Sequence, residues 1–152
     1  MLDMPEVSKR SVSRSYAQAF LLSVGLFALH TFILFELALV VTRLHTTILK
    51  PLNAHLAGPT IILICFLALF ITHLLEAAAW AAFLHRKAPF ASLIESLYFS
   101  VSSITALGYG DVVLRPPWRV IGACMAINGL LLFGCSTAFL FLIIQKIWLD
   151  LN

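Results

Sequence analysis

Charged side chains are scarce in this chain of 152 residues. Only 11% of the residues are Asp, Glu, Lys or Arg, whereas 61% are hydrophobic. A soluble globular domain is usually about a quarter charged and about half apolar. The shortage of charge therefore indicates a small membrane protein with several spans. The formal net charge of +3 is also too small to indicate a nucleic-acid partner.

Cysteine is rare as well, and its placement argues against a metal or disulfide pattern. Cys65, Cys124 and Cys135 lie within apolar segments, with no Cys-x-x-Cys pair and no Cys/His spacing typical of zinc. Thiols in such segments usually act as small hydrophobic side chains. No helix carries arginine at every third position, which argues against steep voltage sensing.

Long apolar segments are present instead. A polar N-terminal segment, residues 1–16, precedes the first of them at residues 17–41. A linker over residues 42–58, with short apolar turns that can lie flat on a membrane surface, leads to a second segment at residues 59–84. A third follows at residues 118–148. Because about 20 apolar residues cross a bilayer, we expect three transmembrane helices.

Proline and tryptophan mark the ends of these helices. Pro59 is expected in the first turn of the second helix, where its missing N–H costs little. Trp118 and Trp148 begin and end the third helix, which suits the two membrane interfaces.

A fourth apolar segment, residues 90–105, is too short to cross, since it has only about 15 residues. It predicts a re-entrant pore helix, followed by a loop at residues 106–111. Non-helical backbone at such depth is tolerated only where it lines a water-filled path or is buried in protein. Gly108 and Gly110 in this loop can adopt backbone conformations that a Cβ atom penalises.

Residues 105–111 read Thr-Ala-Leu-Gly-Tyr-Gly-Asp, and this stretch closely resembles the selectivity-filter signature of potassium channels. With its flanking spans, the pore domain at residues 59–148 resembles the two-transmembrane pore module of that family. Residues 97–100, Leu-Tyr-Phe-Ser, and Gly129 with residues 133–134, Phe-Gly, carry the rest of the likeness. The additional first helix makes the chain similar to small bacterial ion-channel proteins. The resemblance implies an all-α membrane protein, with three transmembrane helices, a re-entrant pore helix and a filter loop, assembled as a tetramer.

The resemblance also implies a role for the loop and its surroundings. In such channels rings of backbone carbonyls replace the water of a dehydrated K⁺ ion. The negative end of the pore-helix dipole would favour a cation in the central cavity. Tyr109 would pack against Tyr98 and Phe99 as an aromatic cuff. The implied ion-binding filter is Thr105, Ala106, Leu107, Gly108, Tyr109, Gly110 and Asp111, with K⁺ at the carbonyls of Ala106, Leu107, Gly108 and Tyr109 and with Tyr98, Phe99 and Ser102 as filter support.

Two departures from the family pattern concern this site. The common filter reads Thr-Val-Gly-Tyr-Gly, so Ala106 lacks the hydroxyl that normally helps to form the innermost ion site. We expect a weakened inner site, with selectivity largely kept. Ser102 stands where several members carry a glutamate that pairs with the aspartate equivalent to Asp111. Filter stability must then depend more on Tyr98 and Thr105, although Ser102 is equally well interpreted as a packing hydroxyl bonded to backbone.

Side chains of the last helix recur every four residues and are expected to share one face. The resemblance implies that this face lines the pore. Phe141 is a candidate hydrophobic gate, or it packs against a neighbouring helix. Gly129 is a bending point or a site of close packing, and Asn128 is expected to form an interhelical hydrogen bond. The candidate pore-lining or gate residues are Gly129, Phe133, Thr137, Phe141 and Gln145.

Four ionisable residues lie inside the first two helices, where such groups are costly and usually face protein or water. His30 and Glu36 belong to the first, and His73 and Glu76 to the second. Because His73 and Glu76 are three residues apart, they share a helix face, and His30 falls at a similar depth. A cross-helix pair is therefore predicted, either as a pH-sensitive coupling of the extra helix to the pore or, as we favour, as a structural clamp.

These observations predict a potassium-selective channel that works as a homotetramer in a cell membrane, most simply a bacterial inner membrane. K⁺ is the permeant ion. We expect no catalysis, no cofactor, no small-molecule substrate and no partner besides lipid and further copies. The alternatives left open are a weakly selective cation channel because of Ala106, a non-conducting membrane subunit, and a haem or metal protein using His30 and His73.

Overall fold

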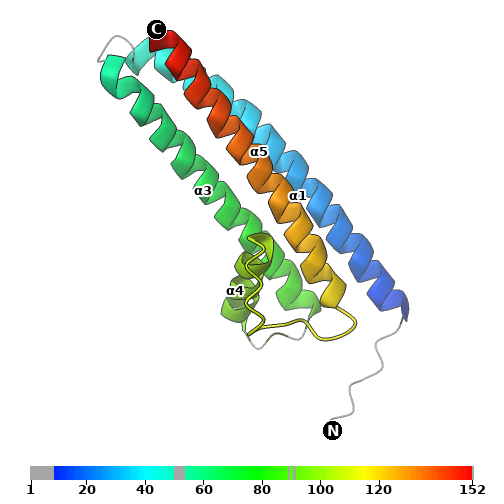
Figure 1. Cartoon of the computed structure of the whole chain (residues 1–152). Helices are drawn as coiled ribbons and strands as arrows, with labels where there is room; N and C mark the ends of the chain where they lie inside the picture. The colour runs from blue at the N-terminus through cyan, green and yellow to red at the C-terminus, as the bar shows by residue number, and fades with distance from the viewer. Residues whose placement is uncertain (1–8, 50–53, 89, 91, 152) are drawn as a thin grey trace. The chain divides into compact units, whose positions relative to one another are not determined.

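The computed structural model describes residues 9–49, 54–88, 90 and 92–151. Within this part of the chain every regular element is helical and none is a strand, which confirms the expected all-α class. In chain order the elements are α1 (Lys9–Leu44), the π-helix η1 (His45–Leu49), α3 (Ala54–Lys87), α4 (Leu93–Ile104) and α5 (Arg119–Leu151) (Figure 1).

Three of these helices are long and apolar enough to cross a membrane, as the sequence predicts. Their apolar stretches run over Arg10–Thr47, Leu56–Lys87 and Arg119–Leu149. The fourth, α4, has 12 residues and rises only about 18 Å at 1.5 Å per residue, too little to cross a hydrocarbon core of about 30 Å.

The helix bounds differ from the expected spans mainly at their N-terminal ends. Because α1 begins at Lys9, residues 9–16 of the polar segment are helical, while residues 1–8 lie outside the described residues. The expected linker at residues 42–58 is also largely helical, since α1 continues to Leu44 and α3 already begins at Ala54. The polar residues of these segments therefore extend the helices.

Pro59 lies inside α3 rather than in its first turn, so that expectation is wrong. Proline removes the hydrogen bond from its own nitrogen to the carbonyl four residues earlier, and its ring crowds that carbonyl. Ala54, Leu56 and Ala57 are good helix formers, and they extend the helix on the N-terminal side of this missing bond.

The chain divides into two compact units, and each long helix contributes to both. The first, here called the filter unit, comprises residues 1–26 and 77–130, and the second, the histidine unit, comprises residues 27–76 and 131–152. The histidine unit includes α1 from Phe27 onward, α3 up to Glu76, and α5 from Leu131 onward.

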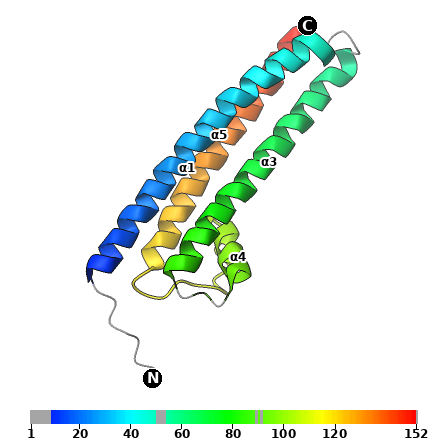
Figure 2. The same cartoon turned by 180° about the vertical axis from the view of Figure 1, so that it is seen from behind.

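The core of the filter unit joins all four of its helices. In Figures 1 and 2, α4 lies beside the C-terminal end of α3, and the filter loop continues from α4. Aromatic and aliphatic side chains fill the space between them. The buried members include Ala19, Leu26, Trp80, Leu84, Phe99, Ile104, Trp118, Ile121 and Met125.

The histidine unit has a core of its own. Its buried apolar members are Val41, Ile61, Cys65, Leu69, Phe139 and Ile143. Gly58 is buried where α3 approaches α5, and a Cβ atom there would come within 2.8 Å of Ile147. The small residue therefore permits close packing of these two helices.

Candidate functional site

The short helix α4 is fixed at its N-terminus by a cap. Ser92 has an extended backbone, and its hydroxyl accepts a hydrogen bond of 3.1 Å from the backbone nitrogen of Glu95. A serine cap satisfies a helix N–H that would otherwise have no partner. The acidic Glu95 in the first turn also suits the positive end of the helix dipole. These features position the start of α4.

The C-terminus of α4 is closed by a turn that begins the filter loop. The Leu107 nitrogen donates to the Ser102 carbonyl, and the Ala106 nitrogen donates to the Ser103 carbonyl, both at 3.0 Å. This pair of bonds, with a left-handed residue between helix and loop, is the Schellman motif. Ala106 takes the left-handed position, with φ of 56°, where glycine is the usual residue.

Left-handed backbone recurs at every second residue of the loop. Gly108 and Gly110 have φ of 54° and 79°, and with Ala106 they are the residues of positive φ in the described chain. A Cβ added to either glycine would meet no atom within 4 Å. The glycines are therefore required by the backbone conformation and not by a lack of space.

The far end of the loop is tied back to α4 through Asp111. The Tyr98 hydroxyl donates to Oδ2 of Asp111 at 2.6 Å, and the Val112 nitrogen donates to Oδ1 at 3.0 Å. The bond from Tyr98 lowers the pKa of Asp111 below its ordinary value, and the bond from Val112 acts in the same direction. The same bond raises the pKa of Tyr98, because Asp111 stabilises the protonated phenol.

The side chains of the loop are exposed on this single chain. Leu107 is 56% and Tyr109 69% exposed. Phe99 is buried instead, with its ring 5.5 Å from that of Phe90. A Cβ on Gly122 of α5 would lie 3.1 Å from Phe99, so the α4–α5 contact includes Gly122, which the sequence did not single out. The aromatic cuff around Tyr109 stays a prediction.

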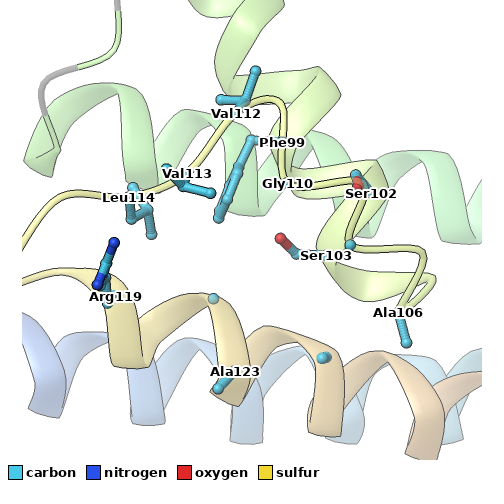
Figure 3. Close-up of a pocket in the computed structure, with 13 residues that line it drawn as sticks. Phe99, Ser102, Ser103, Ala106, Gly110, Val112, Val113, Leu114, Arg119 and Ala123 are labelled. Carbon is cyan, nitrogen blue, oxygen red and sulfur yellow. The ribbon is translucent and has the colours of Figure 1, made fainter.

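A pocket of about 460 Å³ opens between the filter loop and α5. In Figure 3, Phe99, Ser102 and Ser103 lie on the side of α4, and Arg119 and Ala123 lie across from them on α5. The walls are mostly apolar, with two serines and one cation. Ser102, expected behind the filter, is therefore a lining residue of this pocket.

The α5 helix lies close to the end of α4 at Gly129. A Cβ atom there would collide with the backbone of Ile104, which supports the close-packing interpretation of this glycine. The neighbouring Asn128 accepts a hydrogen bond of 3.4 Å from the indole of Trp80 and donates one of 3.2 Å to the Ser23 carbonyl. The expected interhelical hydrogen bond of Asn128 is thus present, and it links α5 to both α1 and α3.

The predicted pore-lining face of α5 is not uniform. Thr137, Phe141 and Gln145 are exposed, whereas Phe133 stacks on His73 of α3 with ring centroids 4.1 Å apart. Four residues turn a helix by about 40° more than a full circle, so residues 133 and 145 differ by about 120° in direction. Phe133 is therefore a contact to α3 on this chain.

Three of the four ionisable residues, His30, His73 and Glu76, form a cluster with Ser136 within the histidine unit, here called the histidine cluster. Oxygens Oε1 and Oε2 of Glu76 lie 2.8 Å from Nδ1 of His30 and of His73, respectively. The Ser136 hydroxyl on α5 lies 3.0 Å from Nε2 of both histidines. The predicted cross-helix pair is present. Glu36 is exposed and, in the part of the chain that the structure describes, forms no hydrogen bond or ion pair with this cluster.

The fold and the loop define a membrane pore protein, and the family comparison agrees. A family model described as an ion channel matches residues 60–146, more than half of the chain. The match runs through α3, α4, the filter loop and α5. This chain therefore belongs to the ion-channel family with the two-transmembrane potassium-channel pore module. No curated protein and no solved structure matches it.

Proposed function

We propose that this chain is a potassium-selective channel whose filter is formed by residues 105–111 from four copies. The observation that carries the proposal is the alternation of left-handed backbone at Ala106, Gly108 and Gly110. A loop that alternates in this way can turn successive carbonyls toward one side, as a filter of carbonyl rings requires. Membership of the ion-channel family supports the same function.

A homotetramer is proposed because one loop per chain cannot surround an ion. The exposed side chains of Leu107 and Tyr109 and the pocket beside the filter loop offer surfaces that neighbouring copies would cover. Contiguous exposed apolar surface of this kind usually marks a protein or membrane contact. The remaining apolar surface of the three spans suits lipid, and we expect the assembly in a bacterial inner membrane.

The gate is proposed on α5, at Phe141. Phe141 is 63% exposed on its own chain and follows Thr137 by one turn. Four such rings around an axis would form a hydrophobic constriction that closes by dewetting. Phe133 is left out of this constriction, because its ring is engaged with His73.

A weakly selective cation channel is the second candidate, because Ala106 lacks a hydroxyl at the inner end of the filter. Purified protein in liposomes with opposed K⁺ and Na⁺ gradients separates the two. We expect a reversal potential near the K⁺ equilibrium potential. A reversal potential midway between the two ions would favour the weakly selective channel, and absence of flux would contradict both.

The matched controls are one variant inside the filter and one outside it. Gly110→Ala places a Cβ at φ of 79° and is expected to abolish flux. Gly25→Ala adds a Cβ that meets no atom within 4 Å and should leave flux unchanged. Native mass spectrometry of the purified assembly should give four chains, and any other number would refute the filter geometry proposed.

A further inference from the structure

The histidine cluster belongs to the histidine unit, and its proton count is unusual. Four hydrogen bonds connect Glu76, His30, Ser136 and His73 in a closed ring, and each bond needs one proton. The Ser136 hydroxyl supplies one. Two neutral imidazoles and an ionised carboxylate supply only two more. The ring therefore lacks one proton for its four hydrogen bonds. Either an additional proton or a metal ion in its place would make up for it.

A metal ion on the Glu76 side would satisfy every group in the ring. Each imidazole would bind it through Nδ1 and keep its own proton on Nε2. Both Nε2–H groups could then donate to Ser136, whose oxygen has two lone pairs. The hydroxyl proton of Ser136 would remain available for a carbonyl of its own helix, as is common for serine.

We propose that His30, His73 and Glu76 bind a divalent transition-metal ion of the Zn²⁺ type. One ligand atom from each residue lies within 4.8 Å of the other two. Two histidines and one glutamate form a known zinc ligand set that leaves one position open. Ser136 is a positioning residue, because a partner on the second ring nitrogen fixes the orientation of a metal-binding imidazole.

Burial and packing favour this site. The side chains of His30 and Glu76 are 0% and 3% exposed, while His73 is 13% exposed. The ring of His73 is held between those of His30, at 5.2 Å, and Phe133, at 4.1 Å. Two ligands are thus almost completely buried, and the third is partly exposed on the single chain.

The ligand types and the charge restrict which ion fits. Imidazole and carboxylate suit Zn²⁺ and Co²⁺, whereas soft ions prefer sulfur, and Cys65 and Cys135 of the same unit are outside the ligand group. One carboxylate leaves a net charge of one unit on a divalent site. A zinc-bound water, whose pKa falls to about 7, can offset this charge by losing a proton.

The proposal is tested by metal binding to the purified assembly in detergent, so it stands or falls independently of ion flux. After treatment with a chelator, the protein is titrated with Co²⁺ and then with Zn²⁺. We expect one Co²⁺ per chain, visible absorption typical of a low-coordinate site, and displacement of Co²⁺ by Zn²⁺. Absence of saturable metal binding would overturn the proposal. The cluster would then hold an additional proton instead of a metal ion.

Variants and a spectroscopic measurement assign the ligands. His30→Gln and Glu76→Gln should abolish binding, and Ser136→Ala should weaken it about 10- to 100-fold. The matched control Glu36→Gln, on the same helix as His30, should bind like the wild type. X-ray absorption spectroscopy of the Zn²⁺-loaded wild type identifies the ligand types directly, so this test does not depend on whether the variants fold. Two imidazole ligands would support the site, whereas sulfur or only oxygen ligands would refute it.

Discussion

Tyr98 and Asp111 join the middle of α4 to the end of the filter loop through a hydrogen bond of 2.6 Å. The bond spans 13 residues, and the other end of the loop is fixed by the turn at Ala106. The loop is therefore held at both ends by the same helix.

Removal of this bond should destabilise the filter without unfolding the helices. Tyr98→Phe keeps the ring and leaves one oxygen of Asp111 without its donor, which is expected to reduce K⁺ flux several-fold. Liposome flux measures the effect, with circular dichroism to check the helices. Asp111→Asn should lower flux similarly, and the double variant should be no worse than either single one. Additive losses would contradict a direct coupling.

The pH dependence of this pair follows from the directions of its pKa shifts. The pKa of Asp111 is lowered by Tyr98, so the stabilisation is complete above the ordinary value near 3.8 and disappears as pH falls through the lowered pKa. The pKa of Tyr98 is raised, so its contribution is complete below about 10 and disappears as pH rises through the raised pKa.

We therefore expect the thermal stability of the assembly to be insensitive to this pair between about pH 5 and pH 9. In Tyr98→Phe the acid loss of stability should become smaller, because the pKa of Asp111 then differs less between the folded and the unfolded state. Thermal unfolding from about pH 2 to about pH 12 measures both limbs. An unchanged acid limb in Tyr98→Phe would exclude the hydrogen bond as the cause.

Ala106 provides a test of backbone strain. A left-handed alanine costs about 1–2 kcal/mol, so Ala106→Gly should stabilise the fold by about 0.5–1 kcal/mol after the entropy cost of glycine. Ala106→Thr would restore the common filter residue, but it places a β-branched side chain at φ of 56° and should destabilise. Unfolding in detergent micelles gives both values. Equal stability of all three proteins would contradict the left-handed assignment.

Gly129 and Gly134 form a matched pair on one helix. Gly129→Ala puts a Cβ against the backbone of Ile104 and should destabilise by about 1–3 kcal/mol. Gly134→Ala meets no atom within 4 Å and should stabilise α5 by up to about 1 kcal/mol. The same unfolding measurement distinguishes them, and a tolerated Gly129→Ala would show that α4 and α5 are farther apart.

Much of the fold could be predicted because apolar length is a direct signal. Three segments are long enough to cross a bilayer and one is too short, and the helices follow that division. The interior position of Pro59 in α3 could not be predicted from the sequence. A single proline disturbs the helix at one point, and the neighbouring residues decide whether the helix continues through it.

The site was predicted in part. The sequence indicated the glycines of the loop and the interhelical role of Asn128, since polar or conformationally special residues have few uses at such positions. The left-handed Ala106 was missed, although a residue directly after a short helix is where a Schellman turn places one. Ser136 was missed too, because a serine in an apolar helix gives no indication of which helix it faces. Phe133 was predicted on the pore face from a four-residue spacing that drifts around the helix, and on this chain its ring stacks on His73.

Hydrogen bonds from α1 determine which part of the chain can fold by itself. Asn128 bonds to Trp80 and to the Ser23 carbonyl, and the Tyr16 hydroxyl donates to the Pro117 carbonyl. Residues 60–146 match the shared module, yet Ser23 and Tyr16 lie before it. If residues 60–146 were expressed alone, the side-chain amide of Asn128 would lose its acceptor at Ser23. The apolar surface that Ala19 and Leu26 cover would also become exposed. In this protein α1 is a structural part of the filter unit. A variant without α1 should therefore fail to fold rather than fold with altered conduction.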